Sequence, residues 1–130
     1  MGLSATLSPS AQRQRTAAPS AAPIDHAHLS RYTLGNYDLE VEVLGLFAGQ
    51  VPQTLAWLIS SGTPKSWRDA AHTLKGSARA VGAWQVAIAA EQAEALSQSV
   101  DLEARRQAIA ALTQALDVAC AYIATLDERR

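Results

Sequence analysis

Residues 67–82 read Trp-Arg-Asp-Ala-Ala-His-Thr-Leu-Lys-Gly-Ser-Ala-Arg-Ala-Val-Gly, and this stretch decides the fold. At about 100° per residue, a helix collects the apolar residues on one face. These are Trp67, Ala71, Leu74, Ala78 and Val81. Such a stripe is suited to burial against other helices. His72 falls nearly opposite, so the sequence predicts an amphipathic helix that holds one histidine in solvent.

The residues around His72 are mostly basic. Arg68, Lys75 and Arg79 share its face, and Gly76 lies one turn after it. A glycine inside a helix costs about 1 kcal/mol relative to alanine, so a functional reason for it is expected. An open imidazole among cations is suited to attack an anionic phosphoryl group, whose oxygens Lys75 and one or both arginines could hold. Gly76 would let another protein approach the ring.

A longer motif surrounds this histidine. The run His72-Thr73-Leu74-Lys75-Gly76-Ser77-Ala78, followed by Val81-Gly82-Ala83, resembles the His-x-Leu-Lys-Gly-Ser/Ala signature of histidine-containing phosphotransfer domains from bacterial two-component phosphorelays. The resemblance covers residues 24–126 and includes Phe47, where the family usually has a phenylalanine on its second helix. It implies a four-helix bundle with His72 as the phosphoacceptor.

The resemblance also implies a helper for the imidazole. Glu94 lies where the family often places a polar or acidic residue that faces the active helix and orients the ring through its second nitrogen. A solvated acid is the alternative, and Glu91 and Gln92 compete for the same role.

Partners and cofactors follow from the same resemblance. A receiver domain phosphorylated on aspartate, or a hybrid histidine kinase, would donate to His72, and a second receiver would accept from it. No cofactor is expected on this chain, since a divalent metal such as Mg²⁺ would be carried by the receiver. No glycine-rich phosphate loop follows a strand, so neither ATP binding nor autokinase activity is expected. The rim around His72 should be apolar or neutral.

Composition sets broader limits. The chain has 130 residues, enough for one domain, and its alanine-rich composition with few β-branched residues favours an all-α fold. The net charge of −1 does not indicate binding to nucleic acid or an anionic membrane. No apolar run reaches the roughly 20 residues that span a bilayer. Cys120 is the only cysteine, which indicates a reducing, cytoplasmic location. We expect a monomer.

Residues 1–23 differ from the rest. They are rich in Ala, Ser, Pro and Gln, hold three of the five prolines and contain no acid. Such a segment cannot bury enough apolar surface to offset chain entropy, so a flexible tail is predicted. An organelle transit peptide is the alternative. Residues 24–130 are predicted to form the bundle.

Capping residues, glycines and prolines mark where the helices of the bundle are expected to begin and end. A short lead-in helix is expected over 24–32 with Asp25 as its cap, followed by a long helix from Asn36 to about Ser60 that contains Pro52. Two helices meeting near Gly49 are the alternative. The motif helix is expected over 64–81, between the Thr63 cap and a left-handed Gly82.

Two further helices complete the prediction. The next is expected over 83–97, with small residues on the face toward its neighbour, and the last begins after Ser99 or Asp101. Its apolar residues repeat by three and four: Ile109, Leu112, Leu116, Ala119, Ile123 and Leu126. Short connections force antiparallel neighbours, so the sequence predicts an up-down-up-down antiparallel four-helix bundle with a lead-in helix.

Other residues have two interpretations each. Trp84 and Ile88 could form an exposed docking patch or pack against the lead-in helix. His26 and His28 could be metal ligands, but no third and fourth ligands accompany them at helical spacing, so no metal is expected. Cys120 is expected to be a small core residue.

Two other functional classes stay open. The chain could be a non-catalytic helical adaptor with the same fold, although an adaptor would not need the intact His-x-Leu-Lys-Gly run. It could instead be a dimeric phosphotransferase like a kinase's dimerisation domain. Those have a His-Glu or His-Asp step on a two-helix hairpin, whereas here Thr73 follows His72.

Overall fold

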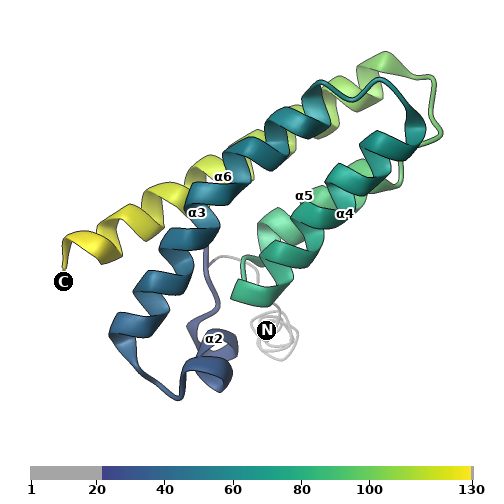
Figure 1. The fold of residues 1–130 in the computed structure, drawn as a ribbon. Helices are drawn as coiled ribbons and strands as arrows, with labels where there is room; N and C mark the ends of the chain where they lie inside the picture. Colours follow the sequence, from purple (N-terminus) through teal and green to yellow (C-terminus); the bar gives the residue numbers. More distant parts are fainter. Residues whose placement is uncertain (1–21, 130) are drawn as a thin grey trace, which may run out of the picture.

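The computed structural model describes residues 22–129, which form five helices (Figure 1). They are α2 (His26–Thr33), α3 (Tyr37–Ile59), α4 (Pro64–Val81), α5 (Trp84–Glu94) and α6 (Leu102–Glu128). The described range contains no strand, which confirms the all-α class. The predicted tail, except for Ala22 and Pro23, lies outside the described residues.

The four long helices form a closed antiparallel ring. Each packs against the next in the sequence, and α6 packs back against α3, while the backbones of the diagonal pairs stay apart. Figure 1 shows the chain reversing direction at every connection, with the α3–α4 and α5–α6 connections at one end and the α4–α5 turn at the other. The predicted up-down-up-down bundle is therefore confirmed.

Polar caps define where four of the helices begin. Asp25, Asn36, Thr63 and Asp101 each accept a hydrogen bond from a backbone N–H in the first turn. Such a cap satisfies one of the amide groups that an α-helix leaves unpaired at its start. Asp101 rather than Ser99 caps α6, which settles the choice that the sequence left open.

Two boundary predictions differ from the structure. The alternative break near Gly49 is wrong, because α3 is one helix of 23 residues that continues through the exposed Pro52. The predicted helix over 83–97 is too long, because α5 ends at Glu94. There the backbone tightens: Leu96 N–H donates to Ala93 and Ser97 N–H to Glu94, both three residues back.

The core comes from the predicted apolar faces. All five residues of the α4 stripe are at most 6% exposed. The small buried residues of α5 belong to the same core cluster. Five of the six repeating residues of α6 are buried, whereas Ile109 is half-buried at the edge of the core. Burial of these faces supplies the main stabilisation of the bundle.

The lead-in helix α2 closes one end of the bundle. Ile24 is 2% exposed, and Asp25 N–H donates to the carbonyl of Gly82 at 2.9 Å. Gly82 adopts the left-handed conformation predicted for it, with φ +77°. Trp84 donates its indole N–H to Asp25 Oδ2 at 2.8 Å, so this tryptophan packs against the lead-in segment rather than forming a docking patch.

Helix α6 is long and apolar. By length and composition alone it could cross a membrane, and it is the one such helix among the described residues. The expectation that no such run exists is therefore wrong. In the structure α6 contributes its apolar stripe to the shared core.

Candidate functional site

His72 stands on the outer face of α4, as predicted. Its side chain is 67% exposed, and its Nδ1 lies 3.0 Å from Glu94 Oε2 on α5. No hydrogen bond to its Nε2 is found among residues 22–129. When one ring nitrogen donates to a carboxylate, the other carries the lone pair. The arrangement therefore presents Nε2 as the nucleophilic nitrogen.

Glu94 links the histidine to a lysine. It is the last residue of α5, its side chain is 21% exposed, and its Oε1 lies 2.6 Å from Lys75 Nζ. The hydrogen bond from Lys75 lowers the pKa of Glu94, against the opposing effect of burial, and the hydrogen bond with His72 lowers it further. Glu94 is thus an ionised carboxylate that can accept from both partners.

Of the three candidates for contact with the imidazole, only Glu94 lies beside it in the described structure. Glu91 instead lies 3.8 Å from Arg79, as measured from Oε1 to Nη2. Gln92 is exposed and lines a groove between α5 and α6. The interpretation of Glu94 as a fully solvated acid does not fit its partial burial and its two charged partners.

The basic residues are less free than the helical wheel suggests. Lys75 is only 15% exposed on its side chain and is engaged by Glu94. Arg79 lies toward Glu91. Arg68 is half-buried and forms no salt bridge within the described range. Their predicted contact with a phosphoryl group would require Lys75 or the arginines to reorient, so this role stays a prediction.

Gly76 leaves open space beside the ring. A Cβ built on this glycine meets no other atom within 4 Å. The fold itself therefore does not require a glycine here, although the residue weakens the helix. Gly45 and Gly49 of α3 are equally open, so access for a partner at Gly76 stays a prediction.

A shallow groove between α3 and α4 lies beyond Gly76. It has a volume of about 270 Å³ and contains no charged side chain; its lining is Val43, Leu46, Phe47, Gln50, Ser77, Ala80 and Val81. Leu46 is 63% exposed at its edge. The sequence predicted a neutral or apolar rim but could not name its residues on α3.

The two lead-in histidines have structural contacts. His26 Nε2 lies 2.6 Å from the hydroxyl of Tyr122, and the ring of His28 packs edge-on against Trp84, with 4.9 Å between centroids. No group of three or more potential ligand side chains able to hold a metal occurs in the part of the chain that the structure describes. Cys120 is half-buried, and burial raises the pKa of its thiol.

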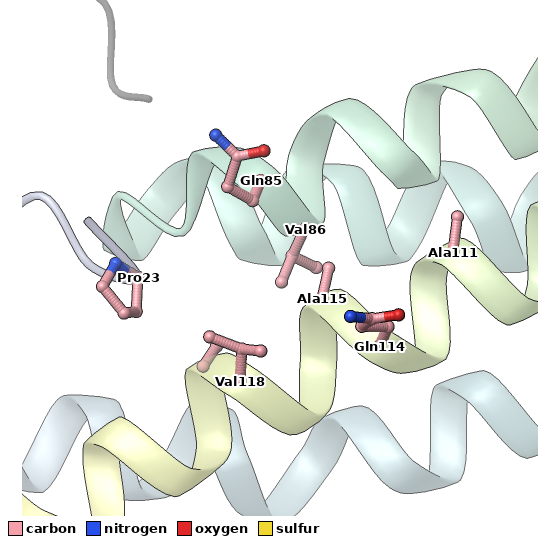
Figure 2. Close-up of a pocket in the computed structure, with 8 residues that line it drawn as sticks. Pro23, Gln85, Val86, Ala111, Gln114, Ala115 and Val118 are labelled. Atoms are coloured by element: carbon pink, nitrogen blue, oxygen red, sulfur yellow. The ribbon is translucent and has the colours of Figure 1, made fainter. Parts of the chain in front are cut away.

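Another groove between α5 and α6, separate from the one that Gln92 lines, has no ionisable side chain in its lining. It has a volume of about 340 Å³, and Figure 2 shows Val86, Ala115 and Val118 around it with Pro23 at one end. It contains none of the residues predicted to carry chemistry, so His72 and its neighbours remain the candidate site. Ile88 is 45% exposed and stays a candidate contact residue.

Comparisons with known proteins show the fold and the family of this chain. The chain has the same fold as a rice protein provisionally assigned as a histidine-containing phosphotransfer protein, with a TM-score of 0.67, 18% identity and 96% coverage of both chains. No curated protein matches the chain significantly. The Hpt domain family matches residues 42–122, a span that holds His72, Lys75, Gly76 and Glu94. This chain is a member of the Hpt domain family, whose members take part in phosphotransfer in phosphorelays.

Proposed function

We propose that this protein is a phosphorelay intermediate that carries a phosphoryl group on His72. The donor would be the phosphorylated aspartate of a receiver domain or of a hybrid histidine kinase, and the acceptor a response-regulator receiver. The observation that carries the proposal is the solvent-exposed imidazole whose Nδ1 is held 3.0 Å from Glu94. Because Nδ1 is held by Glu94, the lone pair on Nε2 can attack a phosphoryl group carried by a second protein.

The transfer step follows from this geometry. The lone pair on His72 Nε2 attacks the phosphorus of the aspartyl phosphate, a new N–P bond forms, and the P–O bond to the aspartate breaks. The departing carboxylate keeps the electron pair. The proton on Nδ1 stays hydrogen-bonded to Glu94, which stabilises the positive charge that develops on the ring as Nε2 becomes phosphorylated. The reverse step returns the phosphoryl group to another aspartate.

Lys75 has two roles in this proposal. In the described state it holds Glu94 in its ionised form. After transfer, the phosphoryl group provides a second anion close to the same helix face, and a flexible ammonium can turn toward it. Arg68 and Arg79 are the other cations on this face and would contribute in the same way.

The groove between α3 and α4 is the proposed docking surface for the receiver. Ser77 and Ala80 of its lining follow Gly76 within the next two turns of α4. A partner seated there would also meet the exposed Leu46 and would pass over the open space at Gly76. An uncharged, partly apolar groove close to the reacting group suits a transient complex.

The remaining chemistry would come from the partner. The receiver would supply a divalent metal such as Mg²⁺ to stabilise the phosphoryl group in the transition state, and this chain would supply a positioned nucleophile. The proposal assigns the chain no ATP site and no autokinase activity. It further assigns a cytoplasmic location and a monomeric state.

Phosphorylation by a labelled receiver tests the proposal. The chain has three histidines, so each can be replaced in turn. We expect an acid-labile phosphoryl group on the native chain, on His26→Gln and on His28→Gln, and none on His72→Gln. Label that persists in His72→Gln would overturn the assignment.

Binding measurements separate the relay from an adaptor. If the native chain binds a receiver but never acquires label, the non-catalytic adaptor becomes the better interpretation. If it acquires label while a sedimentation experiment shows a monomer, the self-contained bundle suffices for transfer.

A further inference from the structure

The C-terminal end of α5 is held by side chains from the two helices beside it. Trp67 of α4, only 3% exposed, donates its indole N–H to the carbonyl of Ala93 at 2.7 Å. Arg105 of α6 donates to the carbonyls of Leu96 and Ser97, and its shortest contact is 2.8 Å. Carbonyls at a helix end lack intrahelical donors. The carbonyls of Ala93 and Leu96 also accept from the N–H groups of Leu96 and Ser99. Trp67 and Arg105 therefore add donors from outside the helix and tie this segment to α4 and α6.

The two side chains also contact each other. The guanidinium carbon of Arg105 lies 4.6 Å from the centroid of the Trp67 ring, which is a cation–π distance. The guanidinium is planar and rigid, so one face can lie on the ring while its edge donates to carbonyls. Trp67 and Arg105 together, which we call the α5 clamp, connect α4, α5 and α6 at one point.

Glu94 lies inside the segment that the α5 clamp holds. It directly follows Ala93, whose carbonyl accepts from Trp67, and it precedes the turn whose carbonyls accept from Arg105. The same Glu94 accepts from His72 Nδ1 at 3.0 Å. Because a hydrogen bond weakens quickly with distance and misalignment, the backbone at the end of α5 controls this contact.

We propose that Arg105 is a positioning residue that fixes the tautomer of His72 by acting through Glu94. It holds the end of α5 so that the Glu94 carboxylate accepts the Nδ1 proton, and this leaves the lone pair on Nε2. Arg105 does not contact the imidazole itself. The tautomer follows from the contact between His72 Nδ1 and the ionised Glu94, whereas its consequence for phosphotransfer rests on the proposed function.

Nitrogen-15 NMR of the imidazole tests the tautomer directly. In Arg105→Met, which keeps an apolar stem against Trp67 but donates nothing, we expect the fraction of His72 protonated on Nδ1 to fall. Arg106→Met is the matched control, because Arg106 is the next residue, is 70% exposed and pairs with Glu103 one turn away. An unchanged tautomer in Arg105→Met would overturn the proposal.

A second variant guards against loss of folding. Trp67→Phe keeps a ring beside Arg105 but removes the N–H that donates to Ala93, and we expect the His72 tautomer to shift in the same direction. Circular dichroism establishes that each variant keeps its helices. A tautomer that stays unchanged in this folded variant would count against control through the end of α5.

A double-mutant cycle separates positioning from general destabilisation. We expect Arg105→Met to slow phosphotransfer about five-fold, the factor that corresponds to a net hydrogen bond of about 1 kcal/mol. In a Glu94→Ala background the same substitution should no longer slow transfer, although it should still lower the melting temperature. Equal slowing in both backgrounds would make Arg105 merely structural.

The two proposals fail in different ways. If His72 never accepts a phosphoryl group but Arg105→Met still shifts its tautomer, the positioning role stands and the relay function falls. If transfer occurs on His72 and the tautomer does not respond to Arg105, the relay function stands and the positioning role falls.

Discussion

Lys75 Nζ lies 2.6 Å from Glu94 Oε1, while the other oxygen of the same carboxylate lies 3.0 Å from His72 Nδ1. One glutamate therefore bridges the nucleophile and a basic side chain of the same helix. The ammonium of Lys75 and the imidazole of His72 are thus joined by hydrogen bonds to the two oxygens of one carboxylate. The site is a connected set of three residues rather than a histidine among separate cations.

Replacing Lys75 should change the titration of Glu94. The hydrogen bond from Lys75 is the main cause that lowers the pKa of Glu94, so in Lys75→Met this pKa should rise toward or beyond its ordinary value of 4.5. Carbon-13 NMR of the Glu94 carboxyl group measures the change. Lys65→Met is the control, since Lys65 pairs with Asp69 instead. A Glu94 that titrates at the same pH in both variants would contradict the assigned link.

The sequence predicted the fold well because local signals and burial agree. The apolar stripe of α4 recurs at helical spacing, and the caps Asn36 and Thr63 stand where the helices begin. The end of α5 was missed because it is set by Trp67 and Arg105, which come from distant parts of the sequence. No local pattern in residues 94–97 signals such contacts.

The site could be predicted only in part for a similar reason. A helical wheel places His72 in solvent, and it gives Lys75 the same face, but it cannot tell where a long side chain turns. Lys75 turns to Glu94 on a neighbouring helix. The groove residues of α3 were not predicted, because which side of α3 lies beside α4 depends on the packing of the whole bundle.

The same substitution at two glycines should have opposite effects on stability. In Gly82→Ala, the new Cβ would lie 2.9 Å from the carbonyl oxygen of Asp25, and φ at this position is +77°. We expect a loss of about 1–3 kcal/mol in the free energy of unfolding. In Gly76→Ala the Cβ meets open space, so we expect a gain of up to about 1 kcal/mol from helix propensity.

Urea denaturation measures both variants. Hydrogen exchange at the Asp25 amide adds a local readout, because this amide donates to the Gly82 carbonyl. Faster exchange is expected in Gly82→Ala and not in Gly76→Ala. Equal stability of the two variants would show that the contact between the lead-in segment and the α4–α5 turn matters less than the geometry indicates.

The buried Glu40 should make stability depend on pH in the acid range. Burial acts to raise its pKa, but hydrogen bonds donated by Thr33 and Ser30, together with the nearby His26, outweigh this effect, and the pKa is lowered below its ordinary value of 4.5. A carboxylate with a lowered folded-state pKa stabilises the fold above the unfolded-state pKa. This contribution is lost as the pH falls through the folded-state value.

The difference in stability between the native chain and Glu40→Gln should therefore depend on pH. We expect Glu40→Gln to be less stable than the native chain at pH 7, and the difference to shrink as the pH falls below about 4.5. Thermal unfolding at several pH values measures it, with the exposed Glu42→Gln as control. A difference that grows toward acid pH would contradict the assigned hydrogen bonds.

A long side chain at Gly76 should block the partner without disturbing the fold. Gly76→Gln fills the open space beside His72, and glutamine has a higher helix propensity than glycine, so the helix should be at least as stable. We expect phosphotransfer from a receiver to fall by at least about ten-fold, or roughly 1.4 kcal/mol in the barrier, because the two reacting centres must meet closely. Gly45→Gln is the matched control: this glycine is also helical and open, but it lies about 100° around α3 from Leu46 and away from the groove.

Transfer from a small phosphodonor such as acetyl phosphate should be affected much less than transfer from the receiver, since no protein surface has to approach. If both donors slow equally, the glutamine perturbs the imidazole itself, and Gly76 serves the ring rather than the partner.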